Sequence, residues 1–204
     1  MSHAHIDDLE RIPVVDGIVY RPIRRRLGVT AFGANAYTAE KPGEHVIEPH
    51  DETSPGSAKH EEMYVVLTGH AAFKVGEEAV DGPPGTLVVV APGTHREATA
   101  TEPDTTVLVI GGEPGAAGPI SPFEYWYAAG PAYNSGDYET AYAIAAEGLE
   151  DHPRNGSLNY NLACYAALAG KLDVARRHLE IAFEEEPRAR EWAKTDEDLR
   201  SITG

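Results

Sequence analysis

The first part of the chain alternates short apolar runs with turn residues. The runs lie at residues 62–67, 71–75, 85–91, 96–100 and 105–110, and Gly, Pro, Asp and Glu residues separate them. Short apolar runs at this regular spacing are typical of the strands of a β-sandwich or a small barrel. Residues 14–23 and 29–38 show similar patterns and predict further strands. The first part is therefore predicted to be all-β.

The pattern changes after residue 121, where positions repeat at an interval of 34 residues. The repeated pairs are Gly136 and Gly170, Ala141 and Ala175, Gly148 and Ala182, Leu149 and Phe183, and Pro153 and Pro187. Glycine suits a tight turn between helices, alanine lets helices cross closely, and proline ends a helix. The period resembles that of the tetratricopeptide repeat, with Asn159 in place of an aromatic residue. The resemblance implies two helical hairpins over about residues 122–187 and a capping helix over 188–202.

Composition marks the boundary between these two parts. Fourteen of the 15 valines lie in residues 1–120, whereas alanine dominates the later part. Residues 111–119 are rich in Gly, Pro and Ala, a composition typical of a flexible connection. We therefore predict a β-domain over residues 1–112, a linker over 113–121 and an all-α domain over 122–204.

The charge balance narrows the classes of partner. The chain has 33 acidic and 17 basic residues and a formal net charge of −16, and both parts are acidic. An acidic surface does not track a phosphate backbone, and no apolar run reaches membrane-spanning length, so we expect neither nucleic acid nor membrane as partner. The single cysteine, Cys164, and the lack of an export signal lead us to expect a cytoplasmic protein. The one basic cluster, Arg21 with Arg24, Arg25 and Arg26, is expected on a solvated strand face.

The segment around Glu62 carries the most informative motif. Glu62 is separated by six residues from Gly69, and a second motif begins at Gly85. In that second motif Ala91, Gly93, Arg96 and Ala100 stand at positions that would be Pro, Gly, His and Asn in a known family. Both spacings resemble those of the cupins, over about residues 20–112. The resemblance implies a jelly-roll barrel, also called a double-stranded β-helix, with a site in its interior.

The same resemblance frames a metal hypothesis. Metal-binding cupins carry two histidines four or five positions before the glutamate, where this chain reads Pro-Gly-Ser-Ala at residues 55–58. His60 shares strand parity with Glu62, and His50 lies on a predicted loop over residues 48–52 that can fold over the barrel mouth. His95 is a weaker candidate, since parity points it outward if Arg96 points inward. A His50, His60 and Glu62 set would suit iron, manganese, nickel or zinc.

Arg96 supports a different hypothesis. A fixed cation in a small site repels a divalent ion and pairs with a carboxylate. Glu62 and Tyr64 share one strand face, so with Arg96 they can bind a small polar or acidic molecule, with Glu62 or Tyr64 available for proton transfer. A purely structural Glu62–Arg96 ion pair is the alternative.

Two functions follow from these hypotheses, and the sequence leaves both open. The first is a protein that binds a small polar or acidic molecule in the barrel, with a helical-repeat tail for contact with a protein partner or for self-association. The alternative is a metal-dependent cupin enzyme, such as a dioxygenase, an isomerase or a lyase. By analogy with cupins we also expect a homodimer, with the strands around residues 14–23 as the contact.

Overall fold

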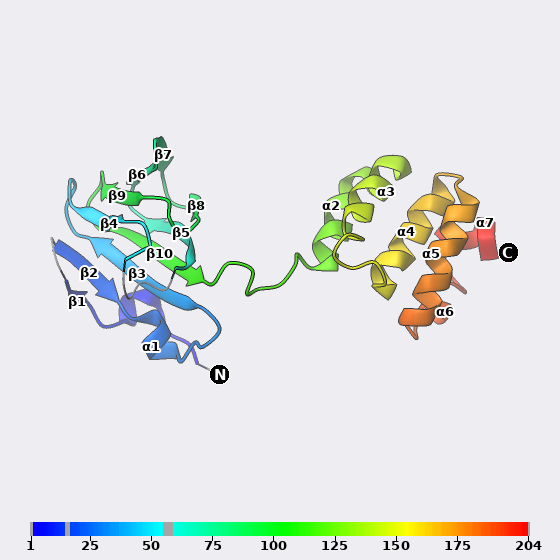
Figure 1. Ribbon diagram of the computed structural model, residues 1–204, viewed down its shortest axis with the longest axis horizontal. Helices are drawn as coiled ribbons and strands as arrows, with labels where there is room; N and C mark the ends of the chain where they lie inside the picture. Colours follow the sequence, from blue (N-terminus) through cyan, green and yellow to red (C-terminus); the bar gives the residue numbers. More distant parts are fainter. Residues whose placement is uncertain (1, 15–16, 55–58, 204) are drawn as a thin grey trace. The chain divides into compact units, whose positions relative to one another are not determined.

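The computed structural model describes residues 2–14, 17–54 and 59–203. The chain divides into two compact units, Met1–Ala117, called here the β unit, and Gly118–Gly204, called the helical unit (Figure 1). None of the helices in the described residues combines the length and apolarity needed to cross a bilayer.

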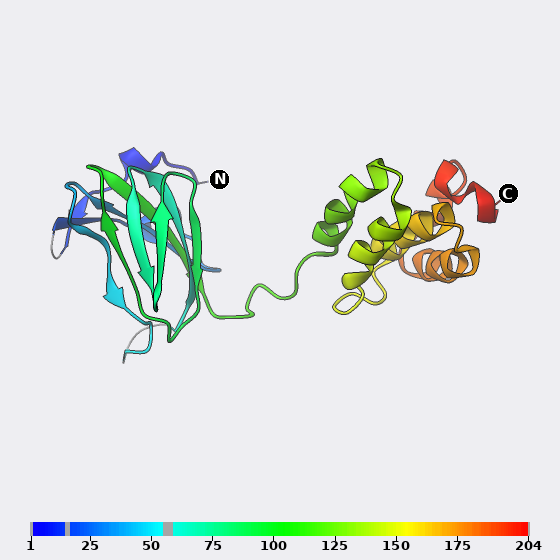
Figure 2. The same ribbon diagram turned by 90° about the horizontal axis from the view of Figure 1, so that it is seen from above.

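Two antiparallel sheets make up the β unit (Figure 1, Figure 2). The six-stranded sheet has the order β1 (Ile12–Pro13), β2 (Ile18–Arg21), β3 (Gly33–Ala39), β10 (Thr105–Gly112), β5 (Glu61–Thr68) and β8 (Leu87–Val90). The four-stranded sheet has the order β4 (His45–His50), β9 (Arg96–Ala100), β6 (Ala71–Val75) and β7 (Glu78–Gly82). Two antiparallel sheets are the architecture that the spacing of the apolar runs predicted for this part of the chain.

The core of the β unit follows the two-residue period of its strands. On β5, Tyr64 and Val66 are buried, and on β9 the buried residues are Arg96, Ala98 and Ala100. Alternate residues of a strand point to the same face of its sheet. Glu62 therefore shares the inner face with Tyr64 and Val66, as its position in the sequence predicted.

The segment after β2 differs from the prediction. Residues 14–23 were expected to be strand with a solvated arginine cluster, but Arg21 ends β2 and is 4% exposed, whereas Arg24, Arg25 and Arg26 lie on α1 (Ile23–Leu27). The guanidinium of Arg21 donates to the Thr38 hydroxyl at 3.1 Å. Arginine is a good helix former, and Gly28, at φ 72°, ends the helix, so the cluster forms a helical turn.

The helical unit contains four main helices that pack in sequence (Figure 2). They are α2 (Pro122–Asn134), α3 (Tyr138–Glu147), α4 (Gly156–Leu168) and α5 (Leu172–Glu185). The starts of α2 and α4 are 34 residues apart, as are those of α3 and α5. Ala141 and Ala175 are fully buried at helix contacts, where a small side chain allows close packing.

The capping helix that was expected near the end of the chain does not form as one helix. Instead of one helix over 188–202, the structure has α6 (Ala189–Trp192), a 3₁₀ turn (Glu197–Leu199) and α7 (Arg200–Thr203). The side chain of Asp196 accepts a hydrogen bond from the backbone N–H of Asp198 at 3.0 Å. An aspartate side chain that accepts from a backbone N–H competes with the hydrogen bonds of a continuous helix. A new helical turn therefore begins after Asp196, which is its N-cap, and the segment does not form a single helix.

Candidate functional site

A cavity of about 260 Å³ opens in the β unit. Its walls come from β2 to β5, from β10, and from the segments that follow β1 and β4. The lining residues are Val14, Ile18, Tyr37, Val46, Ile47, Glu48, Pro49, His50, Glu52, Glu62, Tyr64 and Val109. Its lining combines aliphatic side chains with hydroxyl, imidazole and carboxylate groups. A mostly apolar pocket with a few convergent polar groups is the usual form of a small-molecule site.

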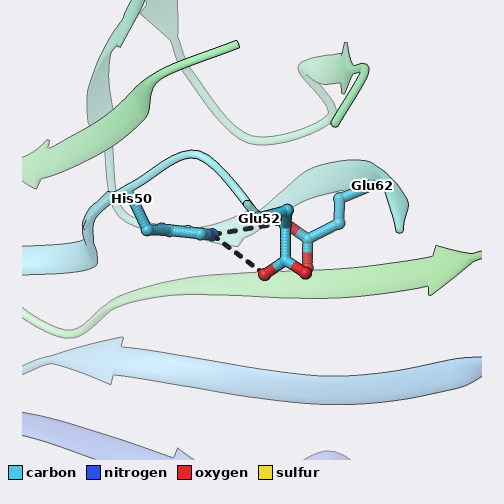
Figure 3. A group of neighbouring side chains, drawn as sticks. All are labelled: His50, Glu52 and Glu62. Carbon is cyan, nitrogen blue, oxygen red and sulfur yellow. Dashed lines mark hydrogen bonds and ion pairs between the residues drawn. The ribbon is translucent and has the colours of Figure 1, made fainter. Parts of the chain in front are cut away.

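Glu62 lies at the centre of these polar groups. It lies near the start of β5, between Val90 of β8 and Gly111 of β10 in the sheet register. Its Oε2 atom accepts a hydrogen bond from the Tyr64 hydroxyl. The same atom lies 3.3 Å from Nε2 of His50 (Figure 3). Three converging contacts, including the ion pair with Arg96 described below, thus hold this one carboxylate.

His50 reaches the same point from the opposite sheet. It ends β4, opposite Arg96 of β9, and its Nδ1 lies 2.6 Å from the carbonyl oxygen of Glu48, to which it donates. Nε2 therefore faces two carboxylates, Glu62 at 3.3 Å and Glu52 at 3.8 Å (Figure 3). An imidazole nitrogen between two carboxylates is stabilised by a positive charge, supplied either by its own proton or by a bound cation.

The protonation states of these groups depend on one another. The hydrogen bond with Glu62 raises the pKa of His50 above its ordinary value. Burial opposes ionisation of Glu62, but hydrogen bonds from His50 and Tyr64 outweigh it and lower the pKa of this carboxyl. Burial and the bond to Glu62 raise the pKa of Tyr64, and burial raises that of Tyr37 to about 12. The site therefore holds an ionised carboxylate beside neutral phenols.

Arg96 lies behind Glu62. It is 1% exposed, and its Nη2 atom lies 3.7 Å from Oε2 of Glu62 and 3.5 Å from the Ala91 carbonyl oxygen, to which it donates. Its Nε and Nη1 atoms are buried without a hydrogen-bond partner in the described part of the chain. Arg96 thus adds positive potential to the site, while Glu62 lines the cavity.

Some of the site residues predicted from the sequence come together in the structure, and others lie apart from them. The structure brings together Glu62, Tyr64, Arg96 and His50, with His50 at the end of β4 and not on the expected loop. His60 precedes β5, and its Nδ1 atom is 3.3 Å from the position that a Cβ at Gly111 would occupy.

His95, residues 55–58 and Glu52 also bear on the site predicted from the sequence. His95 is exposed beside the buried Arg96, as strand parity requires. Residues 55–58, where the cupin histidine pair would lie, are outside the described residues. The sequence reasoning missed Glu52, whose ligand oxygen lies within 4.8 Å of those of His50 and Glu62. The only signal for Glu52 was its position two residues after His50 on a turn.

Comparison with known proteins finds similar folds among solved structures. No protein-family model matches the chain, and no curated protein matches it. KdgF from Halomonas sp. is 20% identical, with a TM-score of 0.46, over 54% of this chain and 92% of that one. A sugar phosphate isomerase of the cupin superfamily from Silicibacter pomeroyi is 20% identical, with a TM-score of 0.45, over 55% and 76%. A predicted oxalate decarboxylase from Thermotoga maritima is 16% identical, with a TM-score of 0.43, over 54% and 97%. Several of the solved structures that resemble this chain are named as cupins, among them the isomerase from Silicibacter pomeroyi and an RmlC-like cupin from Shewanella frigidimarina.

Proposed function

We propose that the β unit binds a small polar molecule in its cavity. The observation that carries this proposal is the hydrogen-bonded group of Glu62, Tyr64 and His50 in the lining of a 260 Å³ cavity. Val46 and Ile47 add aliphatic surface to the same lining, in which the polar groups can orient a ligand.

The charges around the cavity favour a neutral ligand that donates hydrogen bonds. Glu48, Glu52 and Glu62 all line the cavity, while Arg96 lies behind Glu62. An acidic ligand would have to displace Glu62 from Arg96 and approach the other two carboxylates, which costs electrostatic energy. Hydroxyl groups, in contrast, can donate to Glu62 and accept from a protonated His50. Of the two kinds of ligand expected from the sequence, a polar molecule is thus favoured over an acidic one.

This arrangement can also move a proton. An ionised Glu62 can accept a proton from a bound hydroxyl, and His50, with its raised pKa, can donate one at a neighbouring atom. Binding and acid–base chemistry on a small polar molecule therefore share Glu62 and His50.

Thermal-shift measurements with named probes test the proposal. Ribose, glucose and glycerol represent neutral polar ligands, and lactate and succinate represent acidic ones. A probe present at about 100 times its dissociation constant stabilises the folded state by about 2.7 kcal/mol. We expect a neutral probe to raise the melting temperature and Glu62→Gln to remove that rise, while the exposed turn variant Glu77→Gln keeps it. If none of the five probes shifts the wild-type protein, or if Glu62→Gln leaves the shift intact, the proposal is wrong.

A divalent metal is the second candidate occupant, and one observation favours it. Ligand atoms of His50, Glu52 and Glu62 lie within 4.8 Å of one another, and the Nδ1 bond from His50 to the Glu48 carbonyl orients Nε2 as metal-binding histidines require. One imidazole and two carboxylates fit iron, manganese, nickel or zinc. Such an ion would supply Lewis-acid chemistry, as in an isomerase, a lyase or a dioxygenase. Arg96, at 3.7 Å from Glu62, opposes it.

Elemental analysis by mass spectrometry separates the two candidates. For a metal centre we expect a near-stoichiometric transition metal that is lost in His50→Ala and Glu62→Ala. His60→Ala is the matched control, because His60 lies outside the His50, Glu52 and Glu62 group. Absence of metal from the wild-type protein would remove the second candidate and leave the polar-ligand proposal.

We also propose that α2 to α5 form two tetratricopeptide-like hairpins that contact a protein partner or a second copy of the chain. The 34-residue offset between the two helix pairs supports this. Sedimentation at micromolar concentration tests the homodimer, and a monomer would contradict it.

A further inference from the structure

The helical unit contains a second cavity, of about 270 Å³. It lies between α2, α4 and the segment after α6. Five aromatic side chains line it, namely Trp126, Tyr127, Tyr133, Tyr160 and Tyr165. Cys164, Asp196 and Asp198 complete its polar side, together with Asn161. No residue of the β unit takes part, so this cavity is distinct from the proposed ligand site.

Two carboxylates lie together in the lining of this cavity, since one oxygen of Asp196, one oxygen of Asp198 and Sγ of Cys164 lie within 4.8 Å of one another. Asp196 accepts a hydrogen bond from the Tyr160 hydroxyl at 2.8 Å, and Asp198 accepts one from the Tyr133 hydroxyl at 2.8 Å. Within the part of the chain that the structure describes, no ion pair involves either carboxylate. The neighbouring cations Lys194 and Arg200 pair with Glu191 and Glu197 instead.

The aromatic rings are arranged around the same space. Tyr133 packs on Tyr165 with ring centroids 5.4 Å apart, and Trp126 packs on Tyr127 at 5.6 Å. Tyr127 is 66% exposed, so the aromatic wall extends from the cavity to the surface. Faces of aromatic rings carry negative potential and attract a cation within about 6 Å.

We propose that this cavity binds an alkylammonium group. Rings and carboxylates together present negative potential on several sides, and residues 121–204 carry 15 acidic against 8 basic side chains. A cation therefore gains from the aromatic faces and from both carboxylates, whereas an anion is repelled. A neutral apolar ligand would leave the two carboxylates close together with their hydrogen bonds but without a positive charge.

A metal ion fits this cavity less well than an organic cation. The Cys164 thiol is 5% exposed and donates to Asp196 at 3.7 Å, so it acts as a neutral donor. Burial raises the pKa of this thiol, whereas metal binding requires the thiolate. The aromatic lining also offers no ligand atoms that a transition metal prefers.

Calorimetric titration of the full chain tests the proposal. The probes are n-butylammonium and tetramethylammonium chlorides, with 1-butanol as the neutral control for n-butylammonium. We expect saturable one-to-one binding of an alkylammonium ion, with a dissociation constant of about 1 mM or tighter, and no binding of 1-butanol. Asp196→Asn and Asp198→Asn, which keep the side-chain shape, should each weaken binding about tenfold.

Two further variants keep the test independent of folding defects. Gly130 of α2 lines the cavity, and a Cβ there meets nothing within 4 Å, so Gly130→Leu adds an apolar side chain at the cavity wall. This variant should fold and lose binding. Glu180→Gln, at an exposed position of α5, removes one charge elsewhere and should bind as the wild type does.

The outcomes distinguish the proposal from weaker interpretations. No saturable binding of either ammonium ion, equal binding of 1-butanol, or unchanged binding in Gly130→Leu would each overturn it. An acetylated and amidated tripeptide Gly-Lys-Gly distinguishes the source of the ammonium group. Tighter binding of this peptide than of n-butylammonium indicates a lysine side chain of a protein, and equal or weaker binding indicates a free amine.

Discussion

At the scale of single residues, Tyr64 shows how one hydroxyl supports the candidate site. Its O–H donates to an ionised Glu62, and its ring lies 6.0 Å from that of Phe73. Tyr64→Phe keeps the ring and removes the donor, so we expect a loss of about 1.5 kcal/mol of unfolding free energy, as for a hydrogen bond to a charged group. Urea denaturation followed by circular dichroism measures it.

Tyr37 is the matched control for this substitution. It lines the same cavity, but no hydrogen bond of its hydroxyl occurs among the described residues, and burial and nearby charges account for its raised pKa. Tyr37→Phe should therefore change the unfolding free energy by less than about 0.5 kcal/mol. Equal effects of the two substitutions would mean that the Tyr64–Glu62 bond contributes nothing to stability.

His178 gives a pH-dependent prediction for the helical unit. Buried Asn159 donates from Nδ2 to the Asn155 carbonyl at 2.9 Å, so its Oδ1 accepts from Nδ1 of His178, and Nε2 of His178 accepts from Tyr142. A neutral imidazole with its proton on Nδ1 makes both of these hydrogen bonds. Burial, with a contribution from Arg177, lowers the pKa of His178 below its ordinary value of 6.5.

The sign of the effect follows from proton uptake. With a lower pKa in the folded state, the unfolded chain binds more protons as the pH falls through 6.5. Stability from His178 is thus complete above this pH and is lost below it. We expect the tryptophan-fluorescence melting temperature to fall between about pH 7.5 and about pH 5.5, and His178→Gln to reduce that fall. An identical fall in the variant would contradict the role of His178.

Individual residues also show which parts of the candidate site could be predicted from the sequence and which could not. Glu62 and Tyr64 were identifiable because strand parity places them on one face. The contact of His50 with Glu62 depends on the pairing of β4 with β9, which links segments distant in sequence and leaves no local pattern. Asn159 was noted only as a departure from the repeat, whereas it is fully buried and anchors His178.

At the scale of secondary-structure elements, the turn after β5 explains the glycine of the first motif. Gly69 has φ 69°, and a Cβ there would lie 2.6 Å from Cα of Thr105 and in contact with its hydroxyl. Gly69→Ala therefore adds a clash with backbone to an unfavourable conformation, and we expect a loss of more than about 2 kcal/mol in urea denaturation.

Gly76 separates the two causes of this loss. It has φ 57°, but its nearest neighbour would be a methyl group of Thr94 at 4.0 Å. Gly76→Ala should cost only about 1 kcal/mol, the backbone contribution. If the two variants lose equal stability, the close approach of Thr105 is not the reason for Gly69.

The strands that the sequence missed share a physical explanation. β7 (Glu78–Gly82) lies at a sheet edge and carries mostly polar or exposed residues, so its pairing with β6 stabilises it more than any apolar pattern does. β4 contains Pro49 and Glu48, which disrupt the expected alternation. Strands with buried alternate residues, such as β9, were identified with the correct ends. Strands β4 and β7 are stabilised by pairing with neighbouring strands, which no local sequence pattern indicates.

At the scale of the whole molecule, both tryptophans, Trp126 and Trp192, lie in the helical unit. Tryptophan fluorescence therefore reports unfolding of that unit alone, whereas circular dichroism reports both. Each unit has its own buried apolar cluster, which is the requirement for independent folding. We expect two separate transitions in the full chain.

A fragment of residues 1–117 tests this independence directly. Because its core is formed within the β unit, its melting temperature should match that of the β transition in the full chain within about 4 °C, the shift caused by about 1 kcal/mol in a domain of this size. Tyr64→Phe should destabilise the fragment and the full chain equally, while the fluorescence transition of the full chain stays unchanged. An insoluble fragment, or a fluorescence transition that moves with Tyr64→Phe, would show that the units stabilise each other, and the helical unit would then be part of the folding unit that forms the candidate site.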